Sequence, residues 1–285
     1  MNWIKAMADT INYMEDHLTE EIDVRALAKV ACSSTFHYQR MFSFLTDMSI
    51  GDYVRNRRMT MAAADLISTD IKVVDLAYKY RYESAEAFSR AFKSVHGASP
   101  RAVKKGEVPI KAFLKLTIQV SLKGDVPMDY RIEKKEKFGF YGLTKRFSTI
   151  DGANFKEIPV FWQDVMADGS YNKMMATSAS NSCLGVCMPM DPEKETEFDY
   201  LIGFFGEEVV EGYDYHEVPE AEWAVFTVNG KIHPNLPDAW KRIFSEWFPQ
   251  TDFKHAQLPE FEVYLEGDVN SDDYVMEIWI PVEKG

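Results

Sequence analysis

Residues 82–100 read YESAEAFSRAFKSVHGASP, and this stretch sets the fold expected for the first third of the chain. Its apolar side chains recur at the spacing of one helical face: Phe88, Ala91, Phe92 and Val95. Its polar side chains repeat that spacing on a second face: Glu86, Ser89, Arg90 and Lys93. The pattern predicts an amphipathic helix that buries one face and offers the other to a partner.

The same helix pattern occurs fifty residues earlier in the chain. There the apolar stripe consists of Tyr38, Met41, Phe42 and Leu45. The second stripe consists of Phe36, Gln39, Arg40 and Ser43. A short apolar segment precedes each copy, residues 22–28 and residues 71–77, at an offset of 49 residues. The chain therefore repeats a unit made of a short helix, a turn and a second helix.

This repeated unit is typical of a helix-turn-helix motif, whose second helix enters the DNA major groove. A helix over residues 50–67 joins the copies and spans roughly 27 Å at 1.5 Å per residue. Two reading helices at that separation suit adjacent groove segments, which lie about 34 Å apart. Arg55, Arg57 and Arg58 on the joining helix are candidates for phosphate contacts, although such a cluster is more often a solvated face. The pattern predicts double-stranded DNA as a partner.

The charge of the chain is divided unevenly along its length. The formal net charge is −13, which by itself argues against nucleic acid. Residues 1–105, however, hold 15 of the 32 Lys and Arg but only 13 of the 45 Asp and Glu, a net charge of +2. The remaining residues hold the other 17 basic and 32 acidic residues, a net charge of −15. The acidity therefore belongs to the second part of the chain.

Composition also bounds the location and the chemistry of the protein. There is no signal-like apolar segment at the start and no run of 18 apolar residues, so we expect a cytoplasmic protein without a membrane partner. The chain has 3 cysteines, and the spacing of Cys183 and Cys187 is not that of a metal or redox pair. The 6 histidines show no ligand spacing either. We expect reduced thiols, no metal and no cofactor.

The first 105 residues resemble the DNA-binding domain of the AraC/XylS family of transcriptional regulators. The resemblance rests on STFHYQRMF at residues 34–42, on YVRNRRM at residues 53–59 and on residues 82–100. It implies that DNA is contacted from the first motif by Phe36, Gln39 and Arg40, and from the second by Ala85, Glu86, Ser89 and Arg90. Ser43 and Lys93 share these polar faces and are added to the candidates.

The chain departs from the family pattern at two places. Arg81 stands in the second turn where the family commonly has a glycine, at a position that favours a left-handed backbone. Ala85 and Glu86 stand where many relatives carry larger hydrogen-bonding side chains, and Glu86 is repelled by phosphates. We therefore expect the first motif to be the stronger reader, and Arg90 and Lys93 to position the protein on phosphates.

Beyond the DNA-binding domain the periodicity changes to that of strands. Residues 103–109, VKKGEVP, are polar and broken by Gly and Pro, which indicates a linker. Strands are predicted at residues 130–133 and 139–143, then a helix at 154–166 and a strand pair at 183–188 and 200–205. The plan then repeats with a strand at 223–228, a helix at 238–248 and a strand pair at 261–265 and 275–280. The fold class is α+β, with a groove expected between two strand-helix-hairpin halves.

Residues 120–284 resemble GyrI-like effector-binding domains. The resemblance rests on WAVF at residues 223–226, EWFP at 246–249, PEFEVY at 259–264 and EIWIP at 277–281. It implies a groove that binds a small amphipathic, often cationic molecule through aromatic walls and a buried carboxylate. The domains expected are thus 1–105 for DNA binding, 106–119 as a linker and 120–285 for effector binding.

Strand alternation selects the candidate ligand-binding residues. Glu277 shares a strand face with Val275 and Trp279, and Glu262 shares one with Tyr264. A carboxylate beside aromatic rings favours an organic cation through charge pairing and cation-π contact. Glu277 is the preferred anion, followed by Glu262. The candidate aromatic walls, for each of which core packing is an equal alternative, are Tyr141, Phe161, Trp162, Trp223, Tyr264 and Trp279.

Three classes of function compete for this chain. The preferred one is a DNA-binding transcription regulator that senses an amphipathic, possibly cationic molecule and, as the family resemblance implies, contacts RNA polymerase. A GyrI-like hydrolase that uses a glutamate as base is the enzymatic alternative, but the chain has no nucleophile elbow or metal motif. An acidic module that docks a basic protein is the third class. We expect a regulator and not an enzyme.

Overall fold

The computed structural model describes residues 3–31, 35–106, 108–118, 127–149, 152–178, 180–189 and 197–285, with backbone alone at residues 3, 4, 36 and 37. The chain forms two compact units. Unit 1 comprises Met1–Ser34 and Met48–Val120, and unit 2 comprises Thr35–Asp47 and Ser121–Gly285. The division differs from the one expected from sequence, because the helix α3 (Thr35–Thr46) belongs with unit 2.

Unit 1 is helical, as the sequence predicts. Its helices in the described ranges are α1 (Trp3–Asp16), α2 (Val24–Val30), α4 (Ile50–Ser68), α5 (Val73–Lys79), α6 (Ala85–His96) and α7 (Pro100–Lys104). Side-chain caps fix several starts, since Ser49, Ser84 and Ser99 each accept a hydrogen bond from a backbone N–H of the first turn. None of the helices in these ranges has the length and apolar character that a membrane crossing requires.

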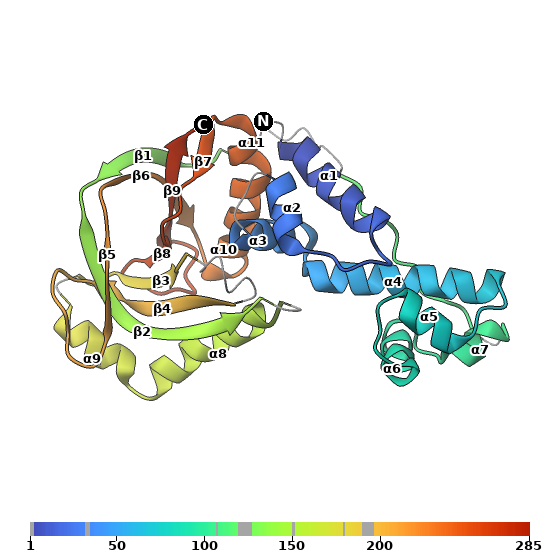
Figure 1. Cartoon of the computed structure of the whole chain (residues 1–285). Coiled ribbons are helices and arrows are strands. Elements are labelled where there is room, and N and C mark those ends of the chain that lie inside the picture. The colour runs from blue at the N-terminus through green and yellow to red at the C-terminus, as the bar shows by residue number, and fades with distance from the viewer. Residues whose placement is uncertain are drawn as a thin grey trace. The chain divides into compact units, whose positions relative to one another are not determined.

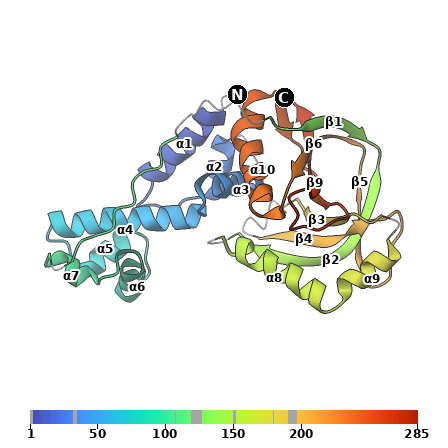
Figure 2. The same cartoon turned by 180° about the vertical axis from the view of Figure 1, so that it is seen from behind.

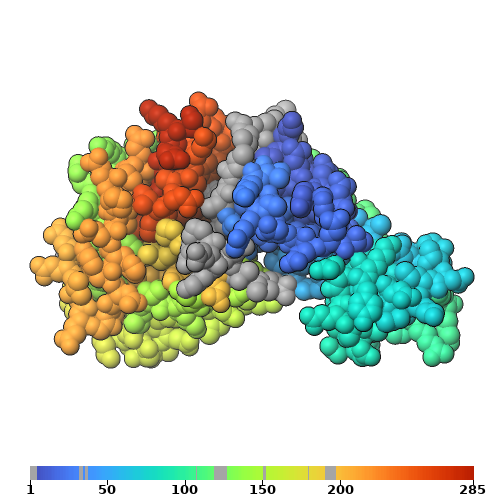
Figure 3. Space-filling model, viewed as in Figure 1, coloured from blue at the N-terminus to red at the C-terminus, as the bar shows by residue number. Residues whose placement is uncertain are grey.

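The predicted apolar stripe of α6 forms part of the core of unit 1. Phe88, Phe92 and Val95 pack with Leu66 of α4 and Leu76 of α5. Figure 3 shows α5, α6 and α7, in teal, gathered into one group. The turn between α5 and α6 places Arg81 in the left-handed region at φ 68°, as the family comparison predicts. A non-glycine residue there costs roughly 1 kcal/mol.

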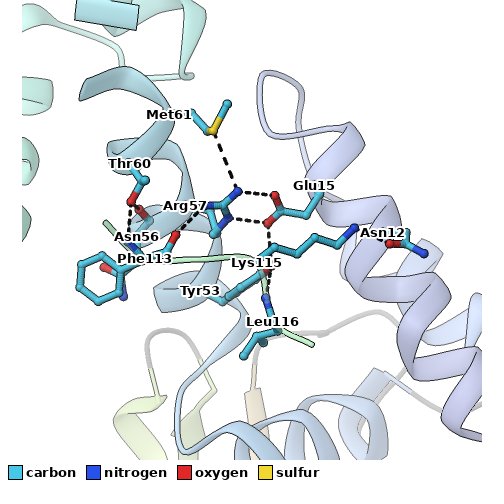
Figure 4. A network of polar contacts seen from close by, with 10 residues as sticks. All are labelled: Asn12, Glu15, Tyr53, Asn56, Arg57, Thr60, Met61, Phe113, Lys115 and Leu116. Carbon is cyan, nitrogen blue, oxygen red and sulfur yellow. Dashed lines mark hydrogen bonds and ion pairs between the residues drawn. The ribbon is translucent and has the colours of Figure 1, made fainter. Parts of the chain in front are cut away.

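The segment predicted as a linker is held against unit 1 over much of its length. Arg57 of α4 donates to the carbonyl oxygen of Phe113, and the Phe113 N–H donates to the Thr60 hydroxyl at 3.0 Å. The ammonium of Lys115 donates to Asn12 of α1. Figure 4 shows this extended segment lying along α4. It therefore forms a strap on unit 1 and not a free spacer over these residues.

Unit 2 contains one antiparallel sheet with the order β1-β6-β9-β8-β3-β4-β2-β5, and β7 pairs with β9. The strands are β1 (Tyr130–Lys135), β2 (Phe138–Ser148), β3 (Cys183–Cys187), β4 (Glu197–Phe205), β5 (Asp214–Val218), β6 (Ala221–Asn229), β7 (Phe253–His255), β8 (Glu260–Tyr264) and β9 (Val275–Lys284). The order β6-β9-β8 mirrors β2-β4-β3. The two predicted strand-helix-hairpin halves are confirmed, and they meet where β3 pairs with β8.

Helices cover one face of this sheet and aromatic residues fill the other. In the first half α8 (Ala153–Ala167) packs on β2 and α9 (Ser170–Thr177) on β4 (Figure 1). In the second half α10 (Ile232–Arg242) packs on β6 and continues as η2 (Ile243–Trp247) and α11 (Phe248–Gln250). Unit 2 therefore has one hydrophobic cluster on each face of the sheet. Neighbouring residues of β2 belong to different clusters, since Tyr141 faces α8 and α9 whereas Phe140 packs with Trp223 and Phe261.

Candidate functional site

A pocket of about 1010 Å³ lies in unit 2, at the join between its two halves. Trp162 from α8 of the first half and Trp240 from α10 of the second half both line it. Tyr200, Glu262 and Tyr264 project from β4 and β8, next to the central β3–β8 pair. The groove that the sequence predicts between the two halves is therefore present.

Glu262 is the polar centre of this pocket. Its carboxylate accepts hydrogen bonds from Trp240 Nε1 at 2.9 Å, Tyr264 Oη at 2.9 Å and Tyr200 Oη at 3.3 Å. Trp162 Nε1 in turn donates to Tyr200 Oη at 3.1 Å. These donors are all neutral, and within the described part of the chain no cationic side chain forms an ion pair with Glu262.

The neighbours of Glu262 stay protonated at neutral pH. Burial, and next the negative charge of Glu262, raise the pKa of Tyr200 and the pKa of Tyr264 well above the usual range. Burial raises the pKa of the Cys183 thiol to about 12 and also raises that of Cys187. These groups therefore remain neutral around the carboxylate. The described residues contain no cluster of His, Cys, Asp and Glu able to hold a metal ion.

Gly185 makes room for this arrangement. It lies directly opposite Glu262 in the β3–β8 ladder. A Cβ atom at this position would stand 2.1 Å from Tyr200 Oη and 3.2 Å from Glu262 Oε2. Only a glycine therefore lets the tyrosine hydroxyl reach the carboxylate across the strand.

A second glutamate of β8 sits two residues before Glu262, on the same strand face. Glu260 is buried with 2% of its surface exposed, and its carboxylate pairs with the Arg40 guanidinium of α3. His255 Nε2 lies 2.8 Å from its other oxygen. Arg40 and Phe44 bring α3 into the lining of the pocket. Unlike Glu262, Glu260 therefore has a cationic partner in this structure.

The expectation that all the predicted ligand-binding residues lie in one groove is wrong. Trp162, Glu262 and Tyr264 line the pocket. Tyr141 and Phe161 are in the core beneath α8 and α9, where the Tyr141 hydroxyl donates to the Met174 carbonyl. The remaining three lie on the opposite face of the sheet: Trp223, Glu277 and Trp279.

Strand register explains why the preferred carboxylate, Glu277, does not line this pocket. Glu262 is paired with Ile278, and Glu277 is paired with Val263. Because paired residues share a face and neighbours along a strand alternate, Glu277 and Glu262 point to opposite sides. Glu277 also has its own cation, since its carboxylate lies 2.9 Å from Arg131. On that face Trp279 borders a separate, more open hollow of about 680 Å³.

The predicted DNA-contacting residues fall into two environments. On α6 of unit 1, Glu86, Arg90 and Lys93 are exposed and Ser89 is half-buried. On α3 of unit 2, Gln39 and Ser43 are half-buried, and the side chain of Phe36 lies outside the described residues. The expected exposed face of the first motif is wrong for Arg40, which is 7% exposed and held by Glu260. In this structure the second motif presents the freer polar face.

The arginines predicted to reach phosphates from α4 are instead engaged within unit 1. Arg57 is buried and forms a double hydrogen bond with Glu15 of α1 (Figure 4). Arg58 donates to the carbonyl oxygens of Leu18 and Glu20, and Arg55 pairs with Asp52. Arg57 and Arg58 thus tie α4 to α1 and to the turn that follows it, whereas Arg55 pairs within α4.

The pocket residues that sequence reasoning did not select include Arg40, Phe44, Tyr200 and Trp240, and the buried Glu260 that pairs with Arg40 was not selected either. One residue of the sequence could have indicated that α3 packs against another element. Phe44 is apolar but lies outside the predicted core stripe of this helix, and the equivalent residue of the second copy is the polar Ser94. Phe44 stacks on Trp240 and Phe244, with ring centroids 5.8 and 5.9 Å apart. An extra aromatic residue on a predicted reading helix thus indicates a second packing surface.

Comparison with known proteins matches each of the two parts of the chain to a protein family. Residues 128–283 match the family model described as a GyrI-like small molecule binding domain, and residues 27–106 match a helix-turn-helix domain. The regulatory protein SoxS of Escherichia coli is 32% identical over 100 residues, which is 35% of this chain and 94% of that protein. The uncharacterized HTH-type transcriptional regulator YbfP of Bacillus subtilis is 40% identical over 104 residues.

These similarities are local. The match to YbfP spans 36% of this chain and only 35% of that relative. Among solved structures, SAV2435 bound to tetraphenylphosphonium has a TM-score of 0.49 and 20% identity, covering 55% of this chain and 94% of that one. Each of these similarities thus covers only part of this chain.

Proposed function

Because this chain belongs to the AraC family of DNA-binding transcription regulators and carries a GyrI-like domain, we propose that the pocket around Glu262 binds an amphipathic organic cation as its effector. The observation that carries the proposal is the state of Glu262. Its carboxylate accepts three hydrogen bonds from neutral donors and has no ion-pair partner among the described residues. A bound cation supplies the missing countercharge.

The pocket walls suit a flat or bulky aromatic cation. Trp162 and Tyr264 meet edge to face with ring centroids 5.2 Å apart, and Trp240 also lines the pocket. Aromatic faces attract cations with delocalised charge and also bury apolar surface. Because Glu262 is already hydrogen-bonded, the site need not reorganise to receive the ligand, which favours affinity.

The function of the whole chain follows from this site and the helix-turn-helix repeat. We propose that the effector changes the binding of promoter DNA and thereby transcription by RNA polymerase, as the AraC-family resemblance implies. The effector is sensed and released unchanged. Incubation with ligand followed by mass spectrometry tests this against the hydrolase alternative, because a cleaved product would identify an enzyme.

The proposal predicts that the Glu262→Gln variant loses affinity for an organic cation. Tetraphenylphosphonium is a suitable probe, because it combines aromatic surface with a delocalised positive charge, and tryptophan fluorescence or calorimetry on the full chain measures its Kd. We expect Glu262→Gln to raise that Kd at least tenfold, which corresponds to about 1.4 kcal/mol. The amide keeps the shape and one hydrogen-bond acceptor but removes the charge.

The matched control is Glu277→Gln, on the opposite face of the same sheet. It removes an equal charge from the neighbouring strand and is expected to leave the Kd unchanged. Tetraphenylborate, an anion of the same shape, should bind the wild-type chain much more weakly. Equal affinity of both ions, or an effect of Glu277→Gln as large as that of Glu262→Gln, would contradict the assignment.

A further inference from the structure

Helix α3 carries the predicted DNA contacts of the first motif but packs in unit 2. It lies beside α10 and η2 in both views of the structure (Figures 1 and 2). Phe44 stacks on Trp240 and Phe244 and meets the ring of Phe155 edge to face at 6.0 Å. One predicted reading helix is thus also a wall of the proposed effector pocket.

Arg40 is the charged side chain that α3 places in this wall. Its guanidinium carbon lies 4.3 Å from the ring centroid of Trp240, and its Nη1 pairs with the buried carboxylate of Glu260. The indole of Trp240 donates to Glu262. One tryptophan therefore contacts Arg40 with its face and the proposed ligand carboxylate with its edge.

The structure assigns to Arg40 the role of an internal cation, which occupies the Trp240 side of the pocket and is displaced, together with α3, by a cationic effector. The assignment rests on the proposed function of the Glu262 pocket. Two cations over one aromatic wall repel each other in a poorly solvated site, so effector and Arg40 compete for it. Arg40 and the neighbouring Gln39 then become available to DNA.

Displacement keeps part of the hydrogen bonding in the pocket. Glu260 keeps its contact with His255 Nε2 at 2.8 Å when Arg40 withdraws. Trp240 keeps its hydrogen bond to Glu262 and exchanges one cation on its face for another. The energetic cost of release comprises the broken Arg40–Glu260 ion pair and the lost apolar contacts of α3, including those of Phe44. The charge and the aromatic surface of the ligand offset part of this cost.

The experiment compares Arg40→Met with Arg90→Met in the full chain. Methionine keeps an apolar chain over Trp240 but removes the charge, and Arg90 is the equivalent residue of the second copy, on α6. Kd values for tetraphenylphosphonium and tetraphenylborate are measured for both variants. We expect Arg40→Met to bind the cation at least fivefold more tightly and the anion more weakly, while Arg90→Met matches the wild type for both.

Hydrogen exchange of the wild-type chain provides a second measurement that needs no variant. Saturating tetraphenylphosphonium should accelerate exchange of the amides of residues 35–46 relative to the free protein, because α3 leaves its packing surface. Slower or unchanged exchange there, with the Kd of Arg40→Met equal to that of the wild type, overturns the displacement while leaving the effector site intact. Absence of cation binding in both wild type and Arg40→Met overturns the proposed function itself, and the role of Arg40 with it.

Discussion

At the scale of single residues, the site depends on what is absent as much as on what is present. Gly185 has no side chain where the Tyr200 hydroxyl approaches Glu262. Among the residues that the structure describes, Glu262 has no cationic partner, whereas Glu260 and Glu277 each have one. The sequence contains all three glutamates in similar aromatic surroundings. The three glutamates differ in their cationic partners, which come from distant strands and helices and are brought together only by folding.

Gly185→Ala should disturb the pocket without touching the ligand directly. The new methyl group meets Tyr200 Oη at 2.1 Å, so the buried ring has to move and its hydrogen bond to Glu262 is lost. We expect a stability loss in unit 2 of about 1–3 kcal/mol and a severalfold higher Kd for tetraphenylphosphonium. Calorimetry gives the Kd, and exchange protection of α6 in unit 1 serves as the internal control. Wild-type affinity in this variant would show that the Tyr200 contact is dispensable.

At the scale of elements, Glu15 joins α1 to α4 through Arg57 and Tyr53 (Figure 4). Burial raises the pKa of Glu15, but the hydrogen bonds from Arg57 and Tyr53 outweigh it, so the pKa lies below its usual value near 4.5. A lowered folded-state pKa gives stability that is complete above the unfolded value and is lost as pH falls through the folded value. This tie therefore weakens in acid, below about pH 4.5.

Glu15→Gln tests that dependence. We expect it to lower the unfolding free energy of unit 1 by about 2 kcal/mol at pH 7, and the difference from wild type should shrink below pH 4.5 as Glu15 becomes protonated in the wild-type protein. Denaturant unfolding followed by amide exchange of α1 and α4 measures it. The exposed pair of Lys134 and Glu220 supplies the control, since Glu220→Gln should change little at either pH. A pH-independent effect of Glu15→Gln would contradict the charge-based tie.

Helix α6 presents the exposed basic residues of the second motif, Arg90 and Lys93. If they contact phosphates, Arg90→Ala should reduce the slope of log K against log salt concentration by about one. The measurement uses a duplex selected from a random pool by the full chain, titrated at several salt concentrations. Lys137→Ala, an exposed cation of unit 2, is the control and should leave the slope unchanged. A lower affinity with an unaltered slope would point to base contact instead.

The elements themselves were predictable to different degrees, for physical reasons. The two strand-helix-hairpin halves followed from two similar runs of alternating strands and amphipathic helices, because strands and helices differ in the period of their apolar residues. The face on which each glutamate lies did not follow, because register depends on pairing between β8 and β9. The two copies of the reading helix also looked alike in sequence, yet Phe44 gives α3 a partner that Ser94 does not give α6.

At the scale of the whole molecule, the order of the chain and the grouping of its elements do not coincide. The sequence repeat predicts α3 and α6 as equivalent members of one domain, whereas the structure groups α3 with the sheet. The strap of residues 113–116 on α4, in contrast, extends unit 1 beyond the boundary that the Gly and Pro residues suggested. Local sequence patterns thus predicted the individual helices and strands well, but they did not predict which unit α3 and the strap belong to.

Unit 2 is built from two separate segments of the chain, and this affects any experiment on a truncated protein. A fragment beginning at residue 127 contains every strand of the sheet but lacks Arg40 and Phe44, so one side of the pocket is missing. Trp240 and Glu260 would face solvent there. A compound screen run on such a fragment would rank molecules against an open cleft with surplus negative charge. The full chain is therefore the appropriate target for identifying a ligand of this pocket.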